Sequence, residues 1–430
     1  MEKRLTKSKE PLTGTVHIPG DKSISHRAVI FGSLAKGTTH ITHFLNGEDC
    51  QRTIEIFRSF GVQIEQKDSN VVIKSGGVES FKEPLVPLYF GNSGTTARLL
   101  LGLLTAFPFH TVAYGDPHLT KRPMDRVITP LKQMGANLDG RKDGLYLPLS
   151  IRGNALQSIT YESPVKSAQV KSAILLAGLF AEGQTTVVEG TKTRNHTENM
   201  LEAFGADITF QKNAVSIQKG KSLRATDVQV PGDISSAAFI LVAAAIVPGS
   251  SVTIKDAGLN KTRAGILTVL EQMGSRFTIT NEKVTGGEST GDITIHHHPL
   301  QGITIDGDII PTLIDEIPII ALLATQAKGQ TVIKDAEELR VKETDRIQAV
   351  VEVLQALGAS VLETKDGMII EGETALKGNF IKGYHDHRMA MMGAIASLIA
   401  EGETTIDDVS SINISYPSFF DDVVCLSKKK

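Results

Sequence analysis

The sequence contains no tryptophan and only two cysteines, Cys50 and Cys425. Two cysteines give neither a disulfide framework nor the spacing of a metal site. Aromatic residues make up 5% of the chain, which leaves few surfaces on which bases could stack, and the net charge of −3 argues against a nucleic-acid or anionic-membrane partner. The longest apolar run, residues 237–247, is too short to cross a bilayer. The first residues are polar and show no apolar region of a signal peptide, so we expect a cytoplasmic protein.

The chain repeats two local patterns, and its 430 residues predict two or three domains. In the first pattern an amphipathic helix ends at an apolar residue and a glycine, as at Gly61, Gly135, Gly205, Gly274 and Gly358. In the second pattern a helix of small residues precedes a glycine and a Thr/Val/Ile strand, as at Gly37, Gly183, Gly249, Gly329 and Gly402. Residues 99–112 supply the missing copy of this second pattern, with Pro108 where the glycine is expected. About six units, each with two helices and several short strands, therefore fill the chain.

A Pro-Gly-Asp turn occurs twice, at residues 19–28 and at residues 230–238. In both places the turn is followed by serine and then by apolar residues, which is typical of a helix start. Only the first copy carries Lys22 and Arg27, which could bind an anion together with free backbone N–H groups. The two copies divide the chain into halves of three units, and a cleft between two domains is a favoured ligand site. A continuous solenoid is the alternative.

Four further stretches combine helix starts with charged residues, namely 91–98, 121–126, 340–346 and 384–391. Each of them taken singly could be an ordinary solvated turn or ion-paired surface. Together they predict a small, multiply anionic ligand that is held by arginines, with acids set among them for proton transfer. Pro123 is expected to begin the helix of the second stretch. Residues His296, His297 and His298 precede Pro299 without matching ligands, so we expect no metal there.

The motifs resemble those of the 5-enolpyruvylshikimate-3-phosphate (EPSP) synthase family over essentially the whole chain. They are Pro-Gly-Asp-Lys-Ser-Ile-Ser-His-Arg from Pro19, Gly-Asn-Ser-Gly-Thr-Thr-Ala-Arg from Gly91, Arg-Pro-Met-Asp-Arg from Arg122, Leu-Arg-Val-Lys-Glu-Thr-Asp-Arg from Leu339 and Asp-His-Arg-Met-Ala-Met from Asp386. Residues 167–171 and 194–198 resemble the second class of that family, whose members vary in glyphosate sensitivity. Some tolerant members carry alanine at the position of Gly94, so we expect intermediate sensitivity here.

The resemblance implies an α/β fold of two similar domains, each of three βαβαββ units. Residues 21–230 would form one domain, residues 1–20 and 231–430 the other, with a cleft between them. It implies transfer of the enolpyruvyl group of phosphoenolpyruvate to the 5-hydroxyl of shikimate 3-phosphate, with release of phosphate and without a metal or organic cofactor. We further expect a monomer, with glyphosate as an inhibitor.

The resemblance also implies a role for each matching residue. Asp315 would take the proton of the attacking hydroxyl, and Glu343 with Lys22 would handle the proton at the methylene carbon. Shikimate 3-phosphate would be held by Lys22, Ser23, Arg27, Ser167, Gln169, Arg194, Asp315 and Lys342. Phosphoenolpyruvate would be held by Lys22, Asn92, Gly94, Arg122, Gln169, Arg346 and Arg388.

Two positions depart from the pattern of some members. His385 stands where they have asparagine, and residues 413–417 lack a lysine that they place before an aromatic-proline pair. The related transferase that acts on UDP-N-acetylglucosamine would need a reactive cysteine in a first-domain loop, where Cys50 and Cys425 do not fall. A non-catalytic phosphometabolite-binding protein would explain the cations but not Asp315 and Glu343. RNA 3′-phosphate cyclases share the unit design, but the charge balance does not suit RNA.

Overall fold

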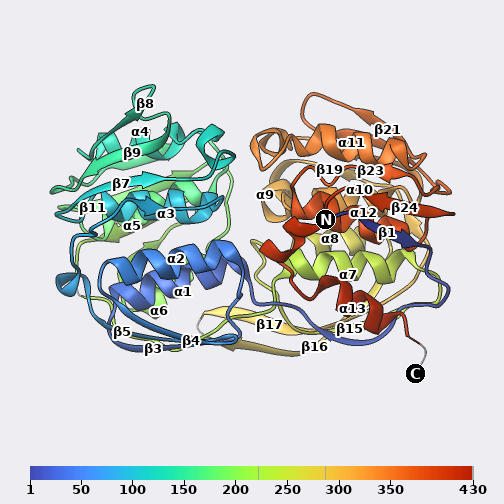
Figure 1. The fold of residues 1–430 in the computed structure, drawn as a ribbon, viewed down its shortest axis with the longest axis horizontal. Coiled ribbons are helices and arrows are strands. Elements are labelled where there is room, and N and C mark those ends of the chain that lie inside the picture. Colours follow the sequence, from blue (N-terminus) through green and yellow to red (C-terminus); the bar gives the residue numbers. More distant parts are fainter. Residues whose placement is uncertain (221, 286, 429–430) are drawn as a thin grey trace. The chain divides into compact units, whose positions relative to one another are not determined.

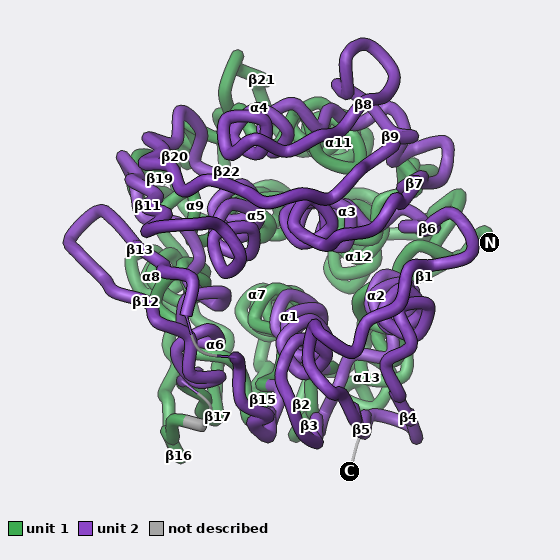
Figure 2. Tube along the Cα trace, turned by 90° about the vertical axis from the view of Figure 1, so that its left-hand side faces the viewer, with its two compact units in different colours: residues 1–19, 231–284, 289–430 green, residues 20–230, 285–288 purple. Residues whose placement is uncertain are grey.

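The chain forms two compact units of mixed α/β structure, shown in Figures 1 and 2. The computed structural model describes residues 1–220, 222–285 and 287–428. One unit comprises Met1–Pro19, Pro231–Val284 and Ser289–Lys430, and we call it the 231–430 unit. The other comprises Gly20–Val230 and Thr285–Glu288, and we call it the 20–230 unit. The divisions at residues 19/20 and 230/231 lie within the two Pro-Gly-Asp turns.

The 20–230 unit contains three four-stranded sheets and six α-helices among its described residues. The sheets have the orders β14 (Val228–Gln229)-β3 (Lys36–Thr42)-β5 (Asn70–Gly76)-β4 (Gln63–Lys67), β6 (Leu88–Tyr89)-β7 (His110–Tyr114)-β9 (Tyr146–Arg152)-β8 (Asn137–Arg141) and β10 (Thr160–Ser163)-β11 (Gln184–Glu189)-β13 (Ala214–Gln218)-β12 (Asp207–Phe210). The helices are α1 (Lys22–Leu34), α2 (Glu48–Ser59), α3 (Gly94–Leu104), α4 (Asp125–Gln133), α5 (Ala168–Gly178) and α6 (His196–Ala203).

In the part of the 231–430 unit that the structure describes there are also three sheets. Their orders are β16 (Arg276–Thr285)-β17 (Glu288–His296)-β15 (Ser251–Gly258)-β2 (Thr13–His17), β18 (Leu300–Gln301)-β20 (Ala327–Ile333)-β22 (Met368–Gly372)-β21 (Ser360–Glu363) with β19 (Thr304–Ile305) also on β20, and β1 (Lys3–Thr6)-β24 (Glu403–Ile406)-β23 (Phe380–Ile381). The helices are α7 (Ile234–Ile246), α8 (Gly265–Gln272), α9 (Ile310–Leu313), α10 (Ile317–Ala324), α11 (Arg346–Ala356), α12 (His387–Ser397) and α13 (Phe419–Leu426).

The order of elements confirms the predicted βαβαββ repeat. It is plainest in the run β6, α3, β7, α4, β8, β9 and in the run β10, α5, β11, α6, β12, β13. In each of these sheets the first strand lies parallel to the second, and the hairpin adds two antiparallel strands. The sixth sheet departs from the pattern, because β1 pairs antiparallel with β24 where a hairpin would stand.

The strands that precede the two Pro-Gly-Asp turns are exchanged between sheets. Strand β2 leads into α1, yet it pairs in parallel with β15. Strand β14 leads into α7, yet it pairs in parallel with β3. Each turn therefore carries the chain from a sheet of one unit to a helix of the other.

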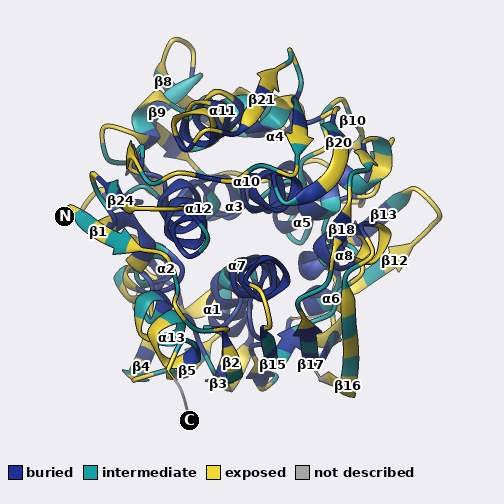
Figure 3. Cartoon of the chain, turned by 90° about the vertical axis from the view of Figure 1, so that its right-hand side faces the viewer, coloured by how far each residue is buried: buried dark blue, intermediate teal, exposed yellow. Residues whose placement is uncertain are grey.

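The helices of small and apolar residues form the core of each unit. Every residue of α7 is buried (Figure 3). Helices α7, α10 and α12 contact one another, and α3 contacts α5 in the 20–230 unit. Such helices are apolar nearly all round, which requires burial on every side.

The glycines of the repeat end helices as predicted. Gly61, Gly135, Gly205, Gly274 and Gly358 all have φ between 81° and 88°. A Cβ atom is strained in this left-handed region, so glycine is the residue that stops these helices most readily.

The expectation that Pro123 begins a helix is wrong. Helix α4 begins at Asp125, and Met124 is its N-cap residue, whose carbonyl accepts hydrogen bonds from the N–H groups of Val127 and Ile128 at 3.0 Å. Pro123 precedes the cap and so lies outside the helix. In the described part of the chain, no helix is both long enough and apolar enough to cross a membrane.

Candidate active site

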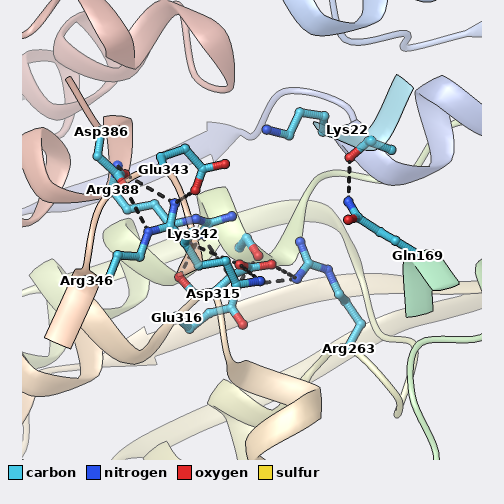
Figure 4. Close-up of polar contacts among 12 residues, drawn as sticks. Lys22, Gln169, Arg263, Asp315, Glu316, Lys342, Glu343, Arg346, Asp386 and Arg388 are labelled. Carbon is cyan, nitrogen blue, oxygen red and sulfur yellow. Dashed lines mark hydrogen bonds and ion pairs between the residues drawn. The ribbon is translucent and has the colours of Figure 1, made fainter. Parts of the chain in front are cut away.

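In the 231–430 unit, residues at helix starts converge on the turn between α9 and α10, which carries Asp315 and Glu316 (Figure 4). Arg346 is the first residue of α11, and Arg388 is the second residue of α12. Lys342 and Glu343 lie in the loop that precedes α11. The repeat thus brings together residues from three helix starts that are far apart in the sequence.

Arg346 is the most deeply held cation of this cluster. Its side chain is 1% exposed and donates from Nε to Asp386 Oδ2 at 2.8 Å and from Nη2 to Glu343 Oε2 at 2.6 Å. Burial acts to lower the pKa of Arg346, but the charges of Asp386, Glu343 and Asp315 outweigh it and raise the pKa above its usual value. Arg346 is therefore a fixed positive charge.

Both carboxylate oxygens of Asp315 face cations. Oδ1 is 3.3 Å from Arg346 Nη1 and 3.5 Å from Lys342 Nζ. Oδ2 is 3.5 Å from Nη1 of Arg263, and the backbone carbonyl accepts a hydrogen bond from Arg388 Nη1 at 2.9 Å. The Asp315 side chain remains 13% exposed, so a ligand could reach it. Nearby cations favour the ionised carboxylate, which is the form that accepts a proton.

The motifs did not indicate Arg263 or Glu316. Arg263 lies in the stretch before α8, and its Nη2 is 3.3 Å from Asp233 Oδ1. Glu316 is fully buried and accepts a hydrogen bond from Ser235 Oγ, while its Oε1 is 3.6 Å from Arg263 Nη1. The only sequence signal was indirect, because Asp233 and Ser235 belong to the second Pro-Gly-Asp turn.

In the 20–230 unit, the start of α1 carries Lys22, Ser23 and Arg27. Arg27 is buried and donates from Nε to Thr197 Oγ1 at 2.6 Å and from Nη2 to Ser172 Oγ at 2.9 Å. Burial lowers the pKa of Arg27 to about 10. Lys22 Nζ is 3.4 Å from Asp49 Oδ2, with 18% of the lysine side chain exposed. Burial and the charges of Lys22 and Arg27 hold the pKa of the neighbouring His26 well below its usual value.

The start of α3 brings Gly94 against two arginines. A Cβ atom at Gly94 would lie 2.8 Å from Arg98 Nη1 and 3.2 Å from Arg122 Cζ. Arg98 in turn donates from Nη1 to Gln169 Oε1 at 3.0 Å, and Gln169 Nε2 donates to Thr95 Oγ1 at 3.1 Å. The structure therefore places the predicted residues Gly94, Arg122 and Gln169 in one cluster.

Ser167 and Arg194 flank a buried ion-pair network. Ser167 is the N-cap residue of α5, and Arg194 lies just before α6. Lys171 of α5 lies between them, with Nζ 2.9 Å from Glu189 Oε2 and 2.6 Å from Glu198 Oε1. These contacts tie α5, the end of β11 and the start of α6 together.

Four further positions that the sequence singled out have other surroundings. Asn92 lies in the turn before α3, and its Oδ1 is buried. His385 is an exposed side chain with Nδ1 3.4 Å from Asp408 Oδ2. His296 ends β17, and no group of three or more potential metal ligands was found among the described residues. Residues 413–415 lie at the end of a 3₁₀ turn, with Ser415 buried.

Comparisons with known proteins agree over nearly the full length. The family model described as EPSP synthase (3-phosphoshikimate 1-carboxyvinyltransferase) matches residues 6–423. A 3-phosphoshikimate 1-carboxyvinyltransferase from Oceanobacillus iheyensis is 59% identical over 417 residues, which is 97% of each chain. One from Bacillus pumilus is 55% identical over 419 residues, covering 97% of this chain and 98% of that protein.

Solved structures give the same result for the fold. An EPSP synthase from Acinetobacter baumannii superposes with a TM-score of 0.89 at 44% identity and covers 99% of this chain and 98% of its own. The enolpyruvyl transferase NikO from Streptomyces tendae, with a TM-score of 0.79 at 19% identity, covers 100% of this chain and 98% of its own and shares the fold. From the matched family model and these relatives, the chain belongs to the EPSP synthase family.

Proposed function

We propose that this chain transfers the enolpyruvyl group of phosphoenolpyruvate to the 5-hydroxyl of shikimate 3-phosphate and releases phosphate, in the shikimate pathway to chorismate and aromatic amino acids. The observation that carries the proposal is the carboxylate of Asp315 among Arg263, Lys342 and Arg346. An ionised acid at a partly exposed position, surrounded by fixed cations, suits proton removal beside an anionic substrate.

In the 231–430 unit, Asp315 acts as the general base that takes the proton of the attacking hydroxyl. Lys342 holds shikimate 3-phosphate, while Arg346 and Arg388 hold phosphoenolpyruvate. Glu343, which accepts a hydrogen bond from Arg346 at 2.6 Å, exchanges the proton at the methylene carbon together with Lys22. Asp386 receives two hydrogen bonds from Arg346 and so keeps this guanidinium in place.

In the 20–230 unit, the residues proposed to bind the two substrates lie at or just before the starts of α1, α3, α4, α5 and α6. Shikimate 3-phosphate is held by Lys22, Ser23, Arg27, Ser167, Gln169 and Arg194. Phosphoenolpyruvate is held by Lys22, Asn92, Gly94, Arg122 and Gln169. Backbone N–H groups at helix starts and arginine guanidinium groups are both suited to phosphate and carboxylate oxygens.

The proposed reaction has two steps that make different demands. The 5-hydroxyl oxygen adds to C2 of phosphoenolpyruvate as Asp315 takes its proton and the methylene carbon gains one. The tetrahedral adduct then loses phosphate, and a proton leaves the methyl carbon to restore the double bond. Cations stabilise the charge that develops on the departing phosphate, so their contribution is largest in the second step.

Neither cysteine supports the UDP-N-acetylglucosamine transferase as an alternative. The thiol of Cys50 is fully buried in α2, and Cys425 is exposed in α13 of the 231–430 unit.

We further propose that glyphosate inhibits the enzyme at the phosphoenolpyruvate position and that the protein acts as a cytoplasmic monomer.

A phosphate-release assay tests the function directly. The protein should release phosphate only when shikimate 3-phosphate and phosphoenolpyruvate are both present, and mass spectrometry should detect the enolpyruvyl product in equal amount. Release from phosphoenolpyruvate alone would indicate a phosphatase, and activity with UDP-N-acetylglucosamine instead would overturn the proposed acceptor.

A further inference from the structure

We propose that Arg263 is a positioning residue for Asp315, and that the second Pro-Gly-Asp turn serves to hold Arg263. This inference rests on the proposed role of Asp315 as general base. From the sequence alone, no chemistry was expected at the second turn, because it lacks the lysine and arginine of the first copy. In the structure the second turn contacts Arg263, which in turn contacts Asp315, so the turn acts on the substrate only through these residues.

Arg263 is buried and faces three carboxylates. The residue is 3% exposed, with Nη2 3.3 Å from Asp233 Oδ1 and Nη1 3.5 Å from Asp315 Oδ2. The same Nη1 is 3.6 Å from Glu316 Oε1. Asp233 and Glu316 are 3% and 0% exposed. Two buried carboxylates therefore hold the Arg263 guanidinium in place.

The second turn provides both anchors of this arrangement. Asp233 is the N-cap residue of α7 and accepts from the backbone N–H of Ser235 at 2.8 Å with the same Oδ1 that faces Arg263. Ser235 Oγ donates to Glu316 Oε1. The turn therefore fixes the arginine that contacts Asp315 and also the acid that follows Asp315 in sequence.

The two oxygens of Asp315 have different partners. Oδ1 faces Lys342 and Arg346, whereas Oδ2 faces Arg263. Lys342 is 25% exposed and has a proposed role with substrate, whereas Arg263 is buried. An anchored contact to Oδ2 sets the orientation of the carboxylate, so that Oδ1 is presented to the substrate hydroxyl.

Arg263 also contributes to the charge balance that keeps Asp315 ionised. Arg263, Lys342 and Arg346 face the Asp315 carboxylate, and Arg388 faces its backbone carbonyl. Glu316 opposes this positive charge indirectly, because it lies near Arg263 and Arg388. Removal of one cation from this set should favour protonation of Asp315, because a nearby opposite charge stabilises the ionised carboxylate.

The principal test replaces Arg263 by glutamine in the full chain. Arg263→Gln should lower kcat by about 10²-fold, the effect of a misplaced catalytic group, with a smaller change in either Michaelis constant. The acid limb of the pH profile of kcat/KM should move to higher pH. Arg263→Lys retains the positive charge. It should therefore restore the position of the acid limb of the pH profile more fully than it restores kcat.

Two control variants separate this effect from loss of stability or charge. Asp292→Asn removes a buried carboxylate that accepts from Lys255 and Asn281 in the same unit, and it should lower stability without moving the pH profile. Arg276→Gln removes an exposed arginine from β16 and should change neither property. If Arg263→Gln does not fold, Asp233→Asn takes its place, because asparagine also caps helices while its neutral amide weakens the hold on Arg263.

A double variant decides whether Arg263 acts through Asp315. In the Asp315→Ala background, Arg263→Gln should cause little further loss of kcat, because residues that act as one unit are not additive. Equal loss in both backgrounds, or an unmoved acid limb in Arg263→Gln, would overturn the inference. Absence of phosphate release by the unmodified protein would instead overturn the proposed function.

Discussion

At the scale of single residues, Asp315 is the position whose replacement is most informative. Asp315→Ala removes the proposed general base and should lower kcat by about 10²- to 10⁴-fold. Shikimate 3-phosphate should still bind, since Lys342, Arg27 and the other proposed ligands remain. Steady-state kinetics give the first quantity and calorimetric titration the second. Near-normal turnover would refute the assigned role.

At Gly94, one added methyl group should discriminate between glyphosate and phosphoenolpyruvate. A Cβ atom would lie 2.8 Å from Arg98 Nη1, so Gly94→Ala must displace a guanidinium at the start of α3. We expect the glyphosate inhibition constant to rise more than the Michaelis constant for phosphoenolpyruvate, since a methyl group in a tight pocket discriminates by roughly 1–3 kcal/mol. Inhibition kinetics on both proteins measure the ratio, and an unchanged ratio would mean that Gly94 does not face the ligand.

The sequence identified site residues that belong to contiguous motifs. It did not identify residues that approach the site from an isolated position in the chain. Arg346, Arg388 and Asp315 were predicted, and the structure brings them together in one cluster. Arg263 was missed because it stands in an unremarkable Asn-Lys-Thr-Arg stretch whose proximity to Asp315 depends on the fold of the whole unit. The roles of the predicted residues stay predictions until they are measured.

At the scale of elements, Lys171 links α5 to the neighbouring β11 and α6. Its side chain is 2% exposed and contacts the carboxylates of Glu189 and Glu198. Lys171→Met leaves both acids buried without this cation, so the free energy of unfolding should fall by about 3–5 kcal/mol. The matched control is Lys219→Met, which breaks the exposed pair with Glu182 in the same unit and should cost at most about 1 kcal/mol. Urea unfolding compares them, and equal losses would contradict the prediction.

The hairpin of β16 and β17 contains a carboxylate whose effect on stability should depend on pH. Burial acts to raise the pKa of Asp292, but hydrogen bonds from Lys255, Asn281 and the backbone N–H of Asp256 outweigh it and lower the pKa to about 2. The folded protein thus binds this proton less tightly than the unfolded chain. The stabilisation is complete above the usual value of 3.8 and is lost as the pH falls toward 2.

Asp292→Asn tests this linkage. The variant should be less stable than the parent at pH 6, and the difference should shrink as the pH is lowered from about 4 to about 2. Thermal unfolding of both proteins across this range gives the difference. A constant difference at every pH would show that the ionised carboxylate is not the source of stability.

Helix boundaries followed from local sequence, whereas strand pairing did not. The Pro-Gly-Asp turns predicted the helix starts of α1 and α7, and the structure shows Asp21 and Asp233 as their N-cap residues. An N-cap depends on neighbours only a few residues away. The pairing of β2 with β15 joins strands more than two hundred residues apart, which no local pattern specifies. The start of α4 was predicted at Pro123 and lies at Asp125, because proline suits a turn ahead of a helix as well as the first helical position.

At the scale of the whole molecule, the proposed phosphoenolpyruvate ligands belong to two units. Arg122 lies in the 20–230 unit, whereas Arg346 and Arg388 lie in the 231–430 unit. If one ligand engages all three, its binding should draw the units together. Shikimate 3-phosphate should therefore lower the radius of gyration in small-angle scattering, and glyphosate added afterwards should bind more tightly than alone. An unchanged radius with unchanged affinity would argue against closure.

The pairing of β1 with β24 has a consequence for synthesis on the ribosome. Lys3 of β1 pairs with Ile406 of β24, so β1 is translated about 400 residues before its partner, a wait of roughly 20–80 s. Strand β2 also waits, until β15 is translated. An unpartnered strand is a template for aggregation, so residues 1–19 should need protection longest in the nascent chain. All three sheets of the 20–230 unit have been translated by then, so the unit that contains residue 1 is the one completed last.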